Sequence, residues 1–289
     1  MSQECDKLGA LWQKCDFATR RELLKLPFFS HGFCANGSAM LTNTEILQIA
    51  LQQSAIDSCC APEDFIKSEN VVALSRENAG RRAYIAEPYA FDLTSYGGNV
   101  VACVRKDLQE VAFSYLAKYS AAHSFETPAL HELDAMLAPF GLKTKFQAEY
   151  FLPDVNAMRA QPCGLPLRVL QPAEFANLYL PQWGNALCAA RRENDVLCVG
   201  AFDGETLAAL AGASADCAAM WQIGVDVLPA YRRRGLAKAV TSRLAQEVFA
   251  RGRVPFYCAA WSNVPSVRNA VACGFRPAWV QLTAKPTEK

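Results

Sequence analysis

The fold of this protein is decided by one stretch, Val225-Asp226-Val227-Leu228-Pro229-Ala230-Tyr231-Arg232-Arg233-Arg234-Gly235-Leu236-Ala237. It begins as a strand, breaks at a proline, places three arginines in a row and starts a helix at Gly235. The first amides of a helix have no partner inside the helix, and the helix dipole adds about half a positive charge there. A phosphate can accept these amides, the arginines add suitable donors, and Gly235 lets a ligand approach the backbone. The junction therefore predicts an anion-binding site.

Strands and helices alternate on both sides of this junction. The residues after it, Leu236, Val240, Leu244 and Val248, recur every four positions, which is typical of an amphipathic helix. Asp203-Gly204 is a two-residue hairpin turn. Strands are predicted over 167–170, 196–202, 206–211, 220–227, 254–260 and 275–284, and helices over 172–180, 235–251 and 263–273. The order from residue 167 is therefore β-α-β-β-β-junction-α-β-α-β.

Two motifs in this order resemble the GNAT acyltransferase superfamily. Arg232-x-x-Gly235-x-Ala237 matches the Arg/Gln-x-x-Gly-x-Gly/Ala loop of that family. Asn263-x-Pro265-Ser266, followed after seven residues by Gly274-Phe275, is similar to the family's helix after the fifth strand and its Gly-Phe end. The resemblance runs from about residue 166 to 285. It implies a fold of the α/β class with a mixed sheet, in which a GNAT-like catalytic domain follows a smaller α+β domain.

The resemblance implies acetyl-CoA, or another acyl-CoA, as co-substrate. In the family, the strand before the loop and the strand after the next helix separate, and the pantetheine arm pairs with the exposed backbone. Here the amides near Val225 and Val227 would bind that arm, and the amides of 233–237 would hold the pyrophosphate. Arg232 matches the family position, whereas Arg233 and Arg234 are exchangeable. The residues implied for cofactor binding are Val225, Val227, Arg232, Arg233, Arg234, Gly235, Leu236, Ala237, Asn263 and Ser266. Asn263 has a second reading as a helix cap.

The catalytic residues are less well marked. The family's acid is a tyrosine on the helix after the fifth strand, and the matching position here is Ala270. Tyr257 and Tyr231 are candidate substitutes, each with a packing role as the alternative. A thiol pKa near 8.5 also allows the thiolate to leave without an acid.

The base that takes the proton of the amine is equally open. Asp226 and Gln222 lie on one side of the predicted strand 220–227, because side chains alternate along a strand. Gln222 can orient a water. The alternative for Asp226 is an ion pair with one of the three arginines. His123 and His131 could reach the site, but surface positions are the default reading for both.

Composition restricts the class of protein. The chain has 289 residues, is 52% hydrophobic and 20% charged, and carries a net charge of +1. This size suits two domains, and the near-neutral charge argues against a nucleic-acid-binding surface. The sequence shows no signal-peptide pattern and no apolar run of membrane-spanning length. The twelve cysteines form no C-x-x-C pair and the three histidines are not spaced as ligands. We therefore expect a cytoplasmic, reduced protein with no metal site, no nucleic acid and no membrane partner.

The first half of the chain reads as a separate unit. Prolines are dense over 152–172, which places a boundary near residue 161. The predicted domains are 1–160, an α+β domain of unknown role that could be a degenerate GNAT-like copy, and 161–289, the acyl-CoA-binding catalytic domain. Within the first, strands are predicted over 71–74, 83–85, 91–94 and 100–104, and helices over 17–26, 43–54, 106–119 and 128–138.

The sequence thus predicts an acyl-CoA-dependent N-acyltransferase, acetyl by preference. The acyl group would pass by direct attack in a ternary complex to a small-molecule or peptide amine of unknown identity, and a homodimer is left open. Two alternatives remain. One is a non-catalytic acyl-CoA sensor, which the absent tyrosine favours. The other is a nucleotide binder, which should carry Gly-x-Gly-x-x-Gly or Gly-Lys-Ser/Thr at a strand–helix junction, and the chain has neither there.

Overall fold

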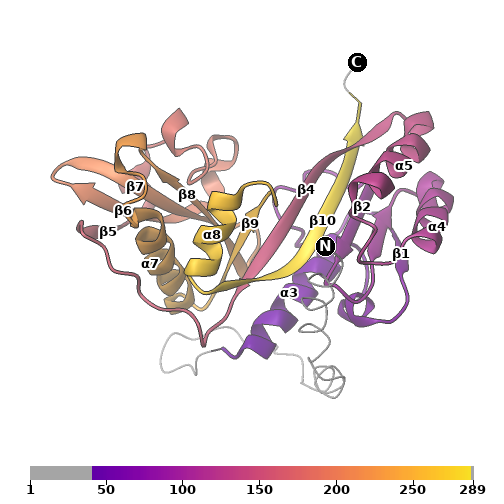
Figure 1. Ribbon diagram of the computed structural model, residues 1–289, viewed down its shortest axis with the longest axis horizontal. Coiled ribbons are helices and arrows are strands. Elements are labelled where there is room, and N and C mark those ends of the chain that lie inside the picture. Colours follow the sequence, from indigo (N-terminus) through magenta and orange to yellow (C-terminus); the bar gives the residue numbers. More distant parts are fainter. Residues whose placement is uncertain (1–40, 288–289) are drawn as a thin grey trace, which may run out of the picture. The chain divides into compact units, whose positions relative to one another are not determined.

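The structure is a computed structural model that describes residues 41–287. The helix predicted over 17–26 lies outside the described residues. Ten strands form one mixed sheet in the order β1-β3-β2-β10-β4-β9-β8-β7-β6-β5 (Figure 1). The strands are β1 (Val71–Leu74), β2 (Phe91–Ser95), β3 (Val101–Val104), β4 (Leu142–Pro153), β5 (Leu167–Leu170), β6 (Asp195–Asp203), β7 (Thr206–Ser214), β8 (Met220–Val227), β9 (Val254–Ala259) and β10 (Phe275–Pro286). The helices are α3 (Asn43–Asp57), α4 (Gln109–Lys118), α5 (Thr127–Leu137), α6 (Pro172–Phe175), α7 (Leu236–Ala250) and α8 (Val264–Ala272).

The element order from β5 to β10 confirms the order predicted from residue 167. β6 and β7 form the predicted hairpin, and Gly204 at its turn has a φ of +60°. β8 and β9 run parallel, and α7 connects them, as a parallel pair requires. Asn263 caps α8, because its side chain accepts a hydrogen bond from the Ser266 amide at 3.3 Å.

Strands from both halves of the chain share the sheet. β10, at the end of the chain, pairs with β2 on one side and with β4 on the other. β4 in turn pairs with β9 through Phe151–Tyr257, Tyr150–Cys258 and Glu149–Ala259. The ladder is therefore continuous across residue 161, and the division into domains 1–160 and 161–289 stays a prediction. The sheet mixes parallel and antiparallel strand pairs, and it includes strands from both sides of residue 161.

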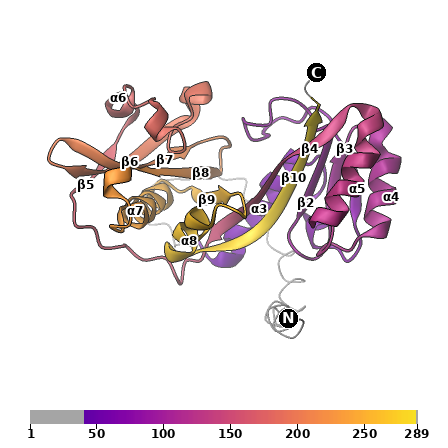
Figure 2. The same ribbon diagram turned by 45° about the horizontal axis from the view of Figure 1, so that its top comes forward.

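Helices pack on the sheet through two main cores. α7 packs against β6, β7 and β8, where Val240, Leu244 and Val248 meet the buried alanines of β7. Those alanines have small side chains, so the helix can approach the strand closely. α4 and α5 pack against β2, β3 and β10, where Leu116 and Leu133 join Phe91 in a second core (Figure 2).

Two local predictions are wrong, and one strand has no counterpart among the predictions. Residues 83–85 form no strand, because this segment is fixed through the buried ion pair of Arg82 with Asp57 and through a bond from the Ala83 amide to the Asp216 carbonyl. The helix predicted over 172–180 is only the single turn α6. The long strand β4 was not predicted at all. By contrast, the helix predicted over 43–54 is α3, which starts in a capping box of Thr42 and Glu45.

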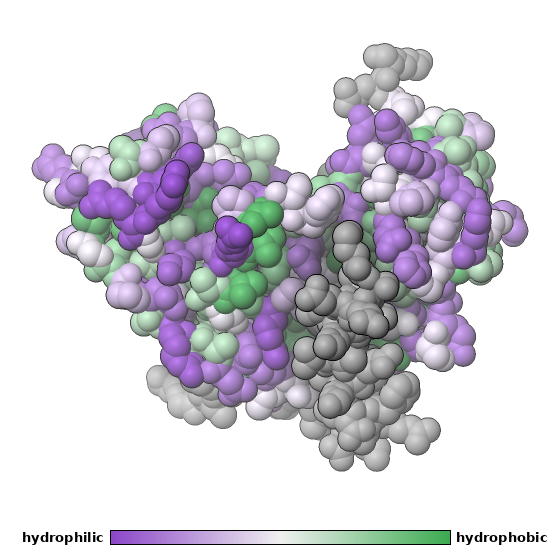
Figure 3. Space-filling model, in the orientation of Figure 1, coloured by the Kyte–Doolittle hydropathy of each residue, from purple (hydrophilic) through white to green (hydrophobic). Residues whose placement is uncertain are grey.

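The surface over α8 is apolar. Figure 3 shows apolar residues gathered there, and Val264 and Val271 of α8 are 46% and 54% exposed.

None of the helices described between residues 41 and 287 is long and apolar enough to cross a membrane.

Candidate functional site

The site begins where β8 and β9 separate. The two strands pair from Met220–Val254 to Ile223–Tyr257, and no pair follows. Beyond this point β8 pairs only with β7, through residues such as Val225 and Val227, while β9 pairs with β4. The facing edges of both strands therefore carry backbone groups that no neighbouring strand uses, and an extended ligand can accept or donate there.

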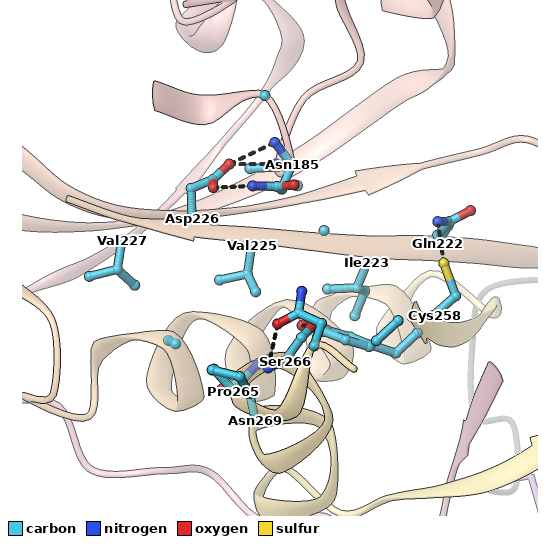
Figure 4. A pocket seen from close by; sticks show the side chains of 18 of the residues that line it. Asn185, Gln222, Ile223, Val225, Asp226, Val227, Cys258, Pro265, Ser266 and Asn269 are labelled. Carbon is cyan, nitrogen blue, oxygen red and sulfur yellow. Dashed lines mark hydrogen bonds between the residues drawn. The ribbon is translucent and has the colours of Figure 1, made fainter. Parts of the chain in front are cut away.

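A cavity of about 1490 Å³ follows this fork (Figure 4). β8, the arginine loop (residues 231–235), the first turn of α7, the end of β9 and the start of α8 line it. Of the predicted site residues, those that line the cavity are Gln222, Val225, Asp226, Val227, Arg232, Arg233, Gly235, Leu236, Ala237, Tyr257, Asn263 and Ser266. Arg234 does not line it, and its guanidinium lies over the ring of Tyr231 at 5.1 Å.

The backbone of the arginine loop is shaped for an anion. Arg233 and Gly235 have φ values of +60° and +81°, and left-handed residues at such spacing turn successive amides to one side. Gly235 is the N-cap of α7 and no side chain caps this end, so the first amides of the helix point outward. No atom lies within 4 Å of the place where a Cβ on Gly235 would be. The space in front of the helix is thus open to a ligand.

Asp226 has a different partner from the one expected. Its carboxylate forms no ion pair with the three arginines. Instead it accepts hydrogen bonds from the amide of Asn185 at 2.8 Å, from Asn185 Nδ2 at 2.6 Å and from the amide of Ala186 at 2.9 Å. Figure 4 shows these bonds on the side of β8 opposite to Val225 and Val227. Both oxygens of the carboxylate are engaged, so its evident role in the structure is to anchor the 185–186 backbone.

The anchored backbone belongs to a wall of the cavity that the sequence analysis missed. Residues 184–188, here called the crossing segment, line the cavity and pass over β7 and β8. A Cβ on Gly212 would lie 1.9 Å from the Ala186 oxygen, and one on Gly224 would lie 1.8 Å from the Asn185 oxygen. Glycine inside an apolar strand often marks a close approach of another backbone. Gly212 and Gly224 were therefore the signal in the sequence that could have predicted this wall.

Gln222 and Cys258 face each other at the closed end of the fork. Gln222 Nε2 donates to Cys258 Sγ at 3.1 Å. Burial raises the pKa of the Cys258 thiol to about 11, so the thiol stays neutral at physiological pH. This contact places a neutral, polar pair beside the point where the strands part.

Tyr257 is a buried residue that lines the cavity. Its ring packs against Phe151 and Phe275, and its hydroxyl lies 2.9 Å from Ser266 Oγ on α8. Burial raises the pKa of the Tyr257 hydroxyl above its usual value, so the group holds its proton at neutral pH. Ala270, the position of the absent tyrosine, is fully buried in the core beneath α8.

The other candidates are less central. Tyr231 lines the cavity but its hydroxyl donates to Asp203 at 3.0 Å. His123 and His131 are exposed and do not line the cavity. Within residues 41–287, no group of His, Cys, Asp and Glu side chains is arranged to hold a metal ion, and every cysteine is free.

One family model matches the part of the chain that forms much of this cavity. Residues 194–278 match the family model described as GNAT acetyltransferase. No curated protein matches the chain.

Several solved structures are similar to this chain. An acetyltransferase from the GNAT family of Novosphingobium aromaticivorans is 19% identical, with 52% of this chain and 69% of that chain covered and a TM-score of 0.42. A GCN5-related N-acetyltransferase from Sphaerobacter thermophilus is 14% identical over 65% of this chain and 72% of that chain, with a TM-score of 0.44. An aminoglycoside N-acetyltransferase in complex with CoA is 18% identical over 42% of this chain and 93% of that chain, with a TM-score of 0.33.

The family match spans β6 to the start of β10 and contains the fork, the arginine loop and α8. This region, residues 194–278, is therefore the part of the chain that matches the GNAT acetyltransferase family model.

Proposed function

We propose that the protein transfers an acyl group, acetyl by preference, from acyl-CoA to a primary amine. One observation carries the proposal: the fork between β8 and β9 opens directly onto the arginine loop, within a single cavity. An extended thioester arm fits an unpaired strand edge, and a pyrophosphate fits the uncapped start of α7. The fork and the start of α7 therefore follow one another along the cavity in the same order as the thioester arm and the pyrophosphate follow one another along acyl-CoA.

In this proposal the backbone does most of the binding. The amides of 235–237 and the left-handed Arg233 hold the pyrophosphate, and Arg232 adds charge. The Arg232 side chain already folds back along the loop, because its Nε donates to the Val227 oxygen at 3.2 Å. The β8 edge near Val225 and Val227 pairs with the pantetheine arm and polarises the thioester carbonyl. Asn263 and Ser266 border the arm from α8.

The reaction proceeds by direct attack. The neutral amine nitrogen attacks the thioester carbon, the C–S bond breaks as the tetrahedral intermediate collapses, and the thiolate takes a proton. We propose Tyr257 as the donor of that proton, because this residue lines the cavity and its hydroxyl stays protonated at neutral pH. Gln222 orients the water through which the amine loses its proton. Asp226 could serve as base only after releasing the backbone of 185–186.

A sensor that binds acyl-CoA without turnover is the second candidate. Two observations favour it: Ala270 replaces the family's tyrosine, and the Asp226 carboxylate is engaged in three hydrogen bonds. The sensor and the enzyme share the cofactor site and differ only in chemistry.

Two measurements test the proposal in sequence. Acetyl-CoA at millimolar concentration should raise the melting temperature, since a ligand that binds the folded state stabilises it by RT ln(1 + [L]/Kd). No shift would refute the cofactor site. Release of free CoA in the presence of a panel of primary amines then separates enzyme from sensor. A homodimer is a further proposal, which light scattering of the purified protein tests.

A further inference from the structure

A row of polar side chains leads from the fork to one end of the cavity. Asp195 of β6 pairs with Ser214 of β7, and Ser214 pairs with Gln222 of β8. Directly paired residues of a regular ladder present their side chains on the same face of a sheet. The β6–β7 register shifts beside Asp195, and its carboxylate is placed on the side of the crossing segment by the hydrogen bond that it accepts from the Cys188 amide. Gln222 shares that face with Asp226, and Figure 4 shows both on the side of β8 that carries the crossing segment. All three residues of the row line the cavity, as does Asp216.

Two residues that line this end of the cavity carry buried oxygens that have no hydrogen-bond partner in the described structure. The Asp216 side chain is 1% exposed, and its Oδ1 accepts from Arg191 Nε at 3.2 Å. Its Oδ2 is buried and has no hydrogen-bond partner, and neither has Ser214 Oγ. Buried polar atoms normally have partners, and an unpaired carboxylate oxygen is among the costliest exceptions. Since both atoms belong to residues that line a cavity, a ligand is the natural partner.

The charge of this end is negative. Asp195 and Asp216 contribute two carboxylates, and Arg191 offsets one of them. Asp195 Oδ2 accepts from the Cys188 amide at 2.8 Å, and burial raises its pKa to about 6, so most of it is ionised above pH 7. Lys145 also lines the cavity, but it lies at the opposite end from Asp216. Asp216 comes before the first residue of β8, whereas Glu149 pairs with the last residue of β9 and Lys145 lies four residues before Glu149 on β4.

We propose that Asp195, Ser214 and Asp216 form a cation subsite that holds a second positive group of the acceptor. An ammonium group has three donors, and the three side chains offer acceptors for them. Gln222 lies between this subsite and the fork, so a chain with two amino groups could keep one end in the subsite while the other reaches the thioester. The acceptors are then diamines or polyamines, not simple monoamines. This inference rests on the proposed acyl transfer.

The test compares 1,5-diaminopentane with pentylamine, which has the same chain and lacks the second charge. At saturating acetyl-CoA, kcat/KM for the diamine should exceed that for the monoamine by about ten-fold or more, since charge-assisted hydrogen bonds are the strong ones. Asp216→Asn keeps an acceptor for Arg191 and should remove most of this preference while leaving pentylamine unchanged. Ser214→Ala deletes an oxygen without an internal partner, so it should fold normally and lower the diamine preference. Glu193→Gln is the control, because Glu193 is exposed and does not line the cavity.

Calorimetric titration of the diamine into the protein with CoA bound makes the inference independent of turnover. Weaker binding to Asp216→Asn than to wild type, with Glu193→Gln unchanged, supports it. Equal binding by wild type and Asp216→Asn, or no binding by either, overturns it, as does an equal kcat/KM for the two amines. If the diamine binds through Asp216 but no amine releases CoA, the subsite stands and the proposed transferase activity fails.

Discussion

Gly212 and Gly224 lie directly opposite each other on β7 and β8, and each leaves room for a backbone oxygen of the crossing segment. The two glycines admit the oxygens of Ala186 and Asn185, and Asp226, two residues after Gly224, binds the amides of the same residues. The two glycines thus give the crossing segment room to lie close to the sheet, and the Asp226 carboxylate holds it there through hydrogen bonds.

Gly224→Ala should displace that wall. A Cβ would lie 1.8 Å from the Asn185 oxygen, which is a backbone atom and cannot rotate away. We expect KM for the acceptor amine to rise about ten-fold and the free energy of unfolding to fall by about 1–3 kcal/mol, as for overpacked cores. The affinity for acetyl-CoA should change less than KM, because the proposed pyrophosphate site at the start of α7 contains neither Gly224 nor the crossing segment. Gly164→Ala is the matched control, since no atom lies within 4 Å of its Cβ position. Normal acceptor kinetics in Gly224→Ala would contradict the role of this wall.

Asp226→Asn distinguishes two roles of Asp226, that of an anchor for the backbone of residues 185–186 and that of the base that takes the proton of the amine. An asparagine amide would face the Asn185 and Ala186 amides with a donor in place of an acceptor, so we expect the free energy of unfolding to fall by about 1–3 kcal/mol. The pH dependence of kcat/KM should keep the same midpoint as in wild type, since Asp226 does not take the proton. Loss of the acidic limb of that profile, with unchanged stability, would assign the base to Asp226 after all.

Tyr257→Phe tests the proposed acid. The ring keeps its packing against Phe151 and Phe275, and only the hydroxyl beside Ser266 is lost. We expect kcat to fall by about 10²-fold with unchanged binding of acetyl-CoA, which is typical of the loss of a general acid. Tyr231→Phe removes a hydroxyl that bonds to Asp203 and should leave kcat unchanged. Equal kcat values for wild type and Tyr257→Phe would mean that the thiolate leaves unassisted.

Most of the candidate site residues could be placed around one cavity from the sequence, because they lie close together in the chain. The strand before Pro229, the glycine at 235 and the cap at Asn263 each follow from neighbouring residues, and twelve of the thirteen predicted site residues line the cavity. β4 escaped prediction because Lys143, Lys145 and Glu149 interrupt its apolar pattern, and its partners β9 and β10 lie far along the chain.

The wall formed by the crossing segment and the row of polar side chains beside it were also missed, because their residues lie far apart in the chain. The crossing segment is held by Gly212, Gly224 and Asp226, and Asp195 meets Ser214 only once the hairpin has formed. No window of the sequence contains these contacts together.

The arginine loop should depend more on Gly235 than on Arg233. A bulky residue at 235, such as valine, must adopt a φ of +81° and would extend into the open space in front of α7. Gly235→Val should therefore abolish the thermal shift caused by acetyl-CoA. Arg233→Ala removes one charge and should weaken binding only a few-fold. Arg233→Gly relieves a left-handed φ of +60° and should be about 1 kcal/mol more stable than Arg233→Ala. Equal losses of binding in Gly235→Val and Arg233→Ala would contradict this division.

Asp92 should make the stability of the protein depend on pH. It is fully buried between β3 and β10, where it accepts hydrogen bonds from Thr283 at 2.6 Å, Gln281 at 3.0 Å and Thr94 at 3.2 Å. Burial raises its pKa from 3.8 to about 7, so the folded protein binds a proton between these values that the unfolded chain releases. Stability therefore falls as the pH rises from about 4 to 7, by on the order of 4 kcal/mol in total.

Asp92→Asn removes this titration and keeps an acceptor for Thr283 and Gln281. Urea unfolding at pH 5, 6, 7 and 8 should show that the wild type loses stability over this range and that the variant has a flatter profile. Asp107→Asn is the control: the hydrogen bond from Arg105 lowers the pKa of Asp107, so this exposed carboxyl is ionised throughout the range and its loss leaves the slope unchanged. If the stability of wild type and of Asp92→Asn changed with pH in the same way, the prediction would be wrong. Asp92 would then stay ionised in the core, stabilised by the three side chains that donate hydrogen bonds to it.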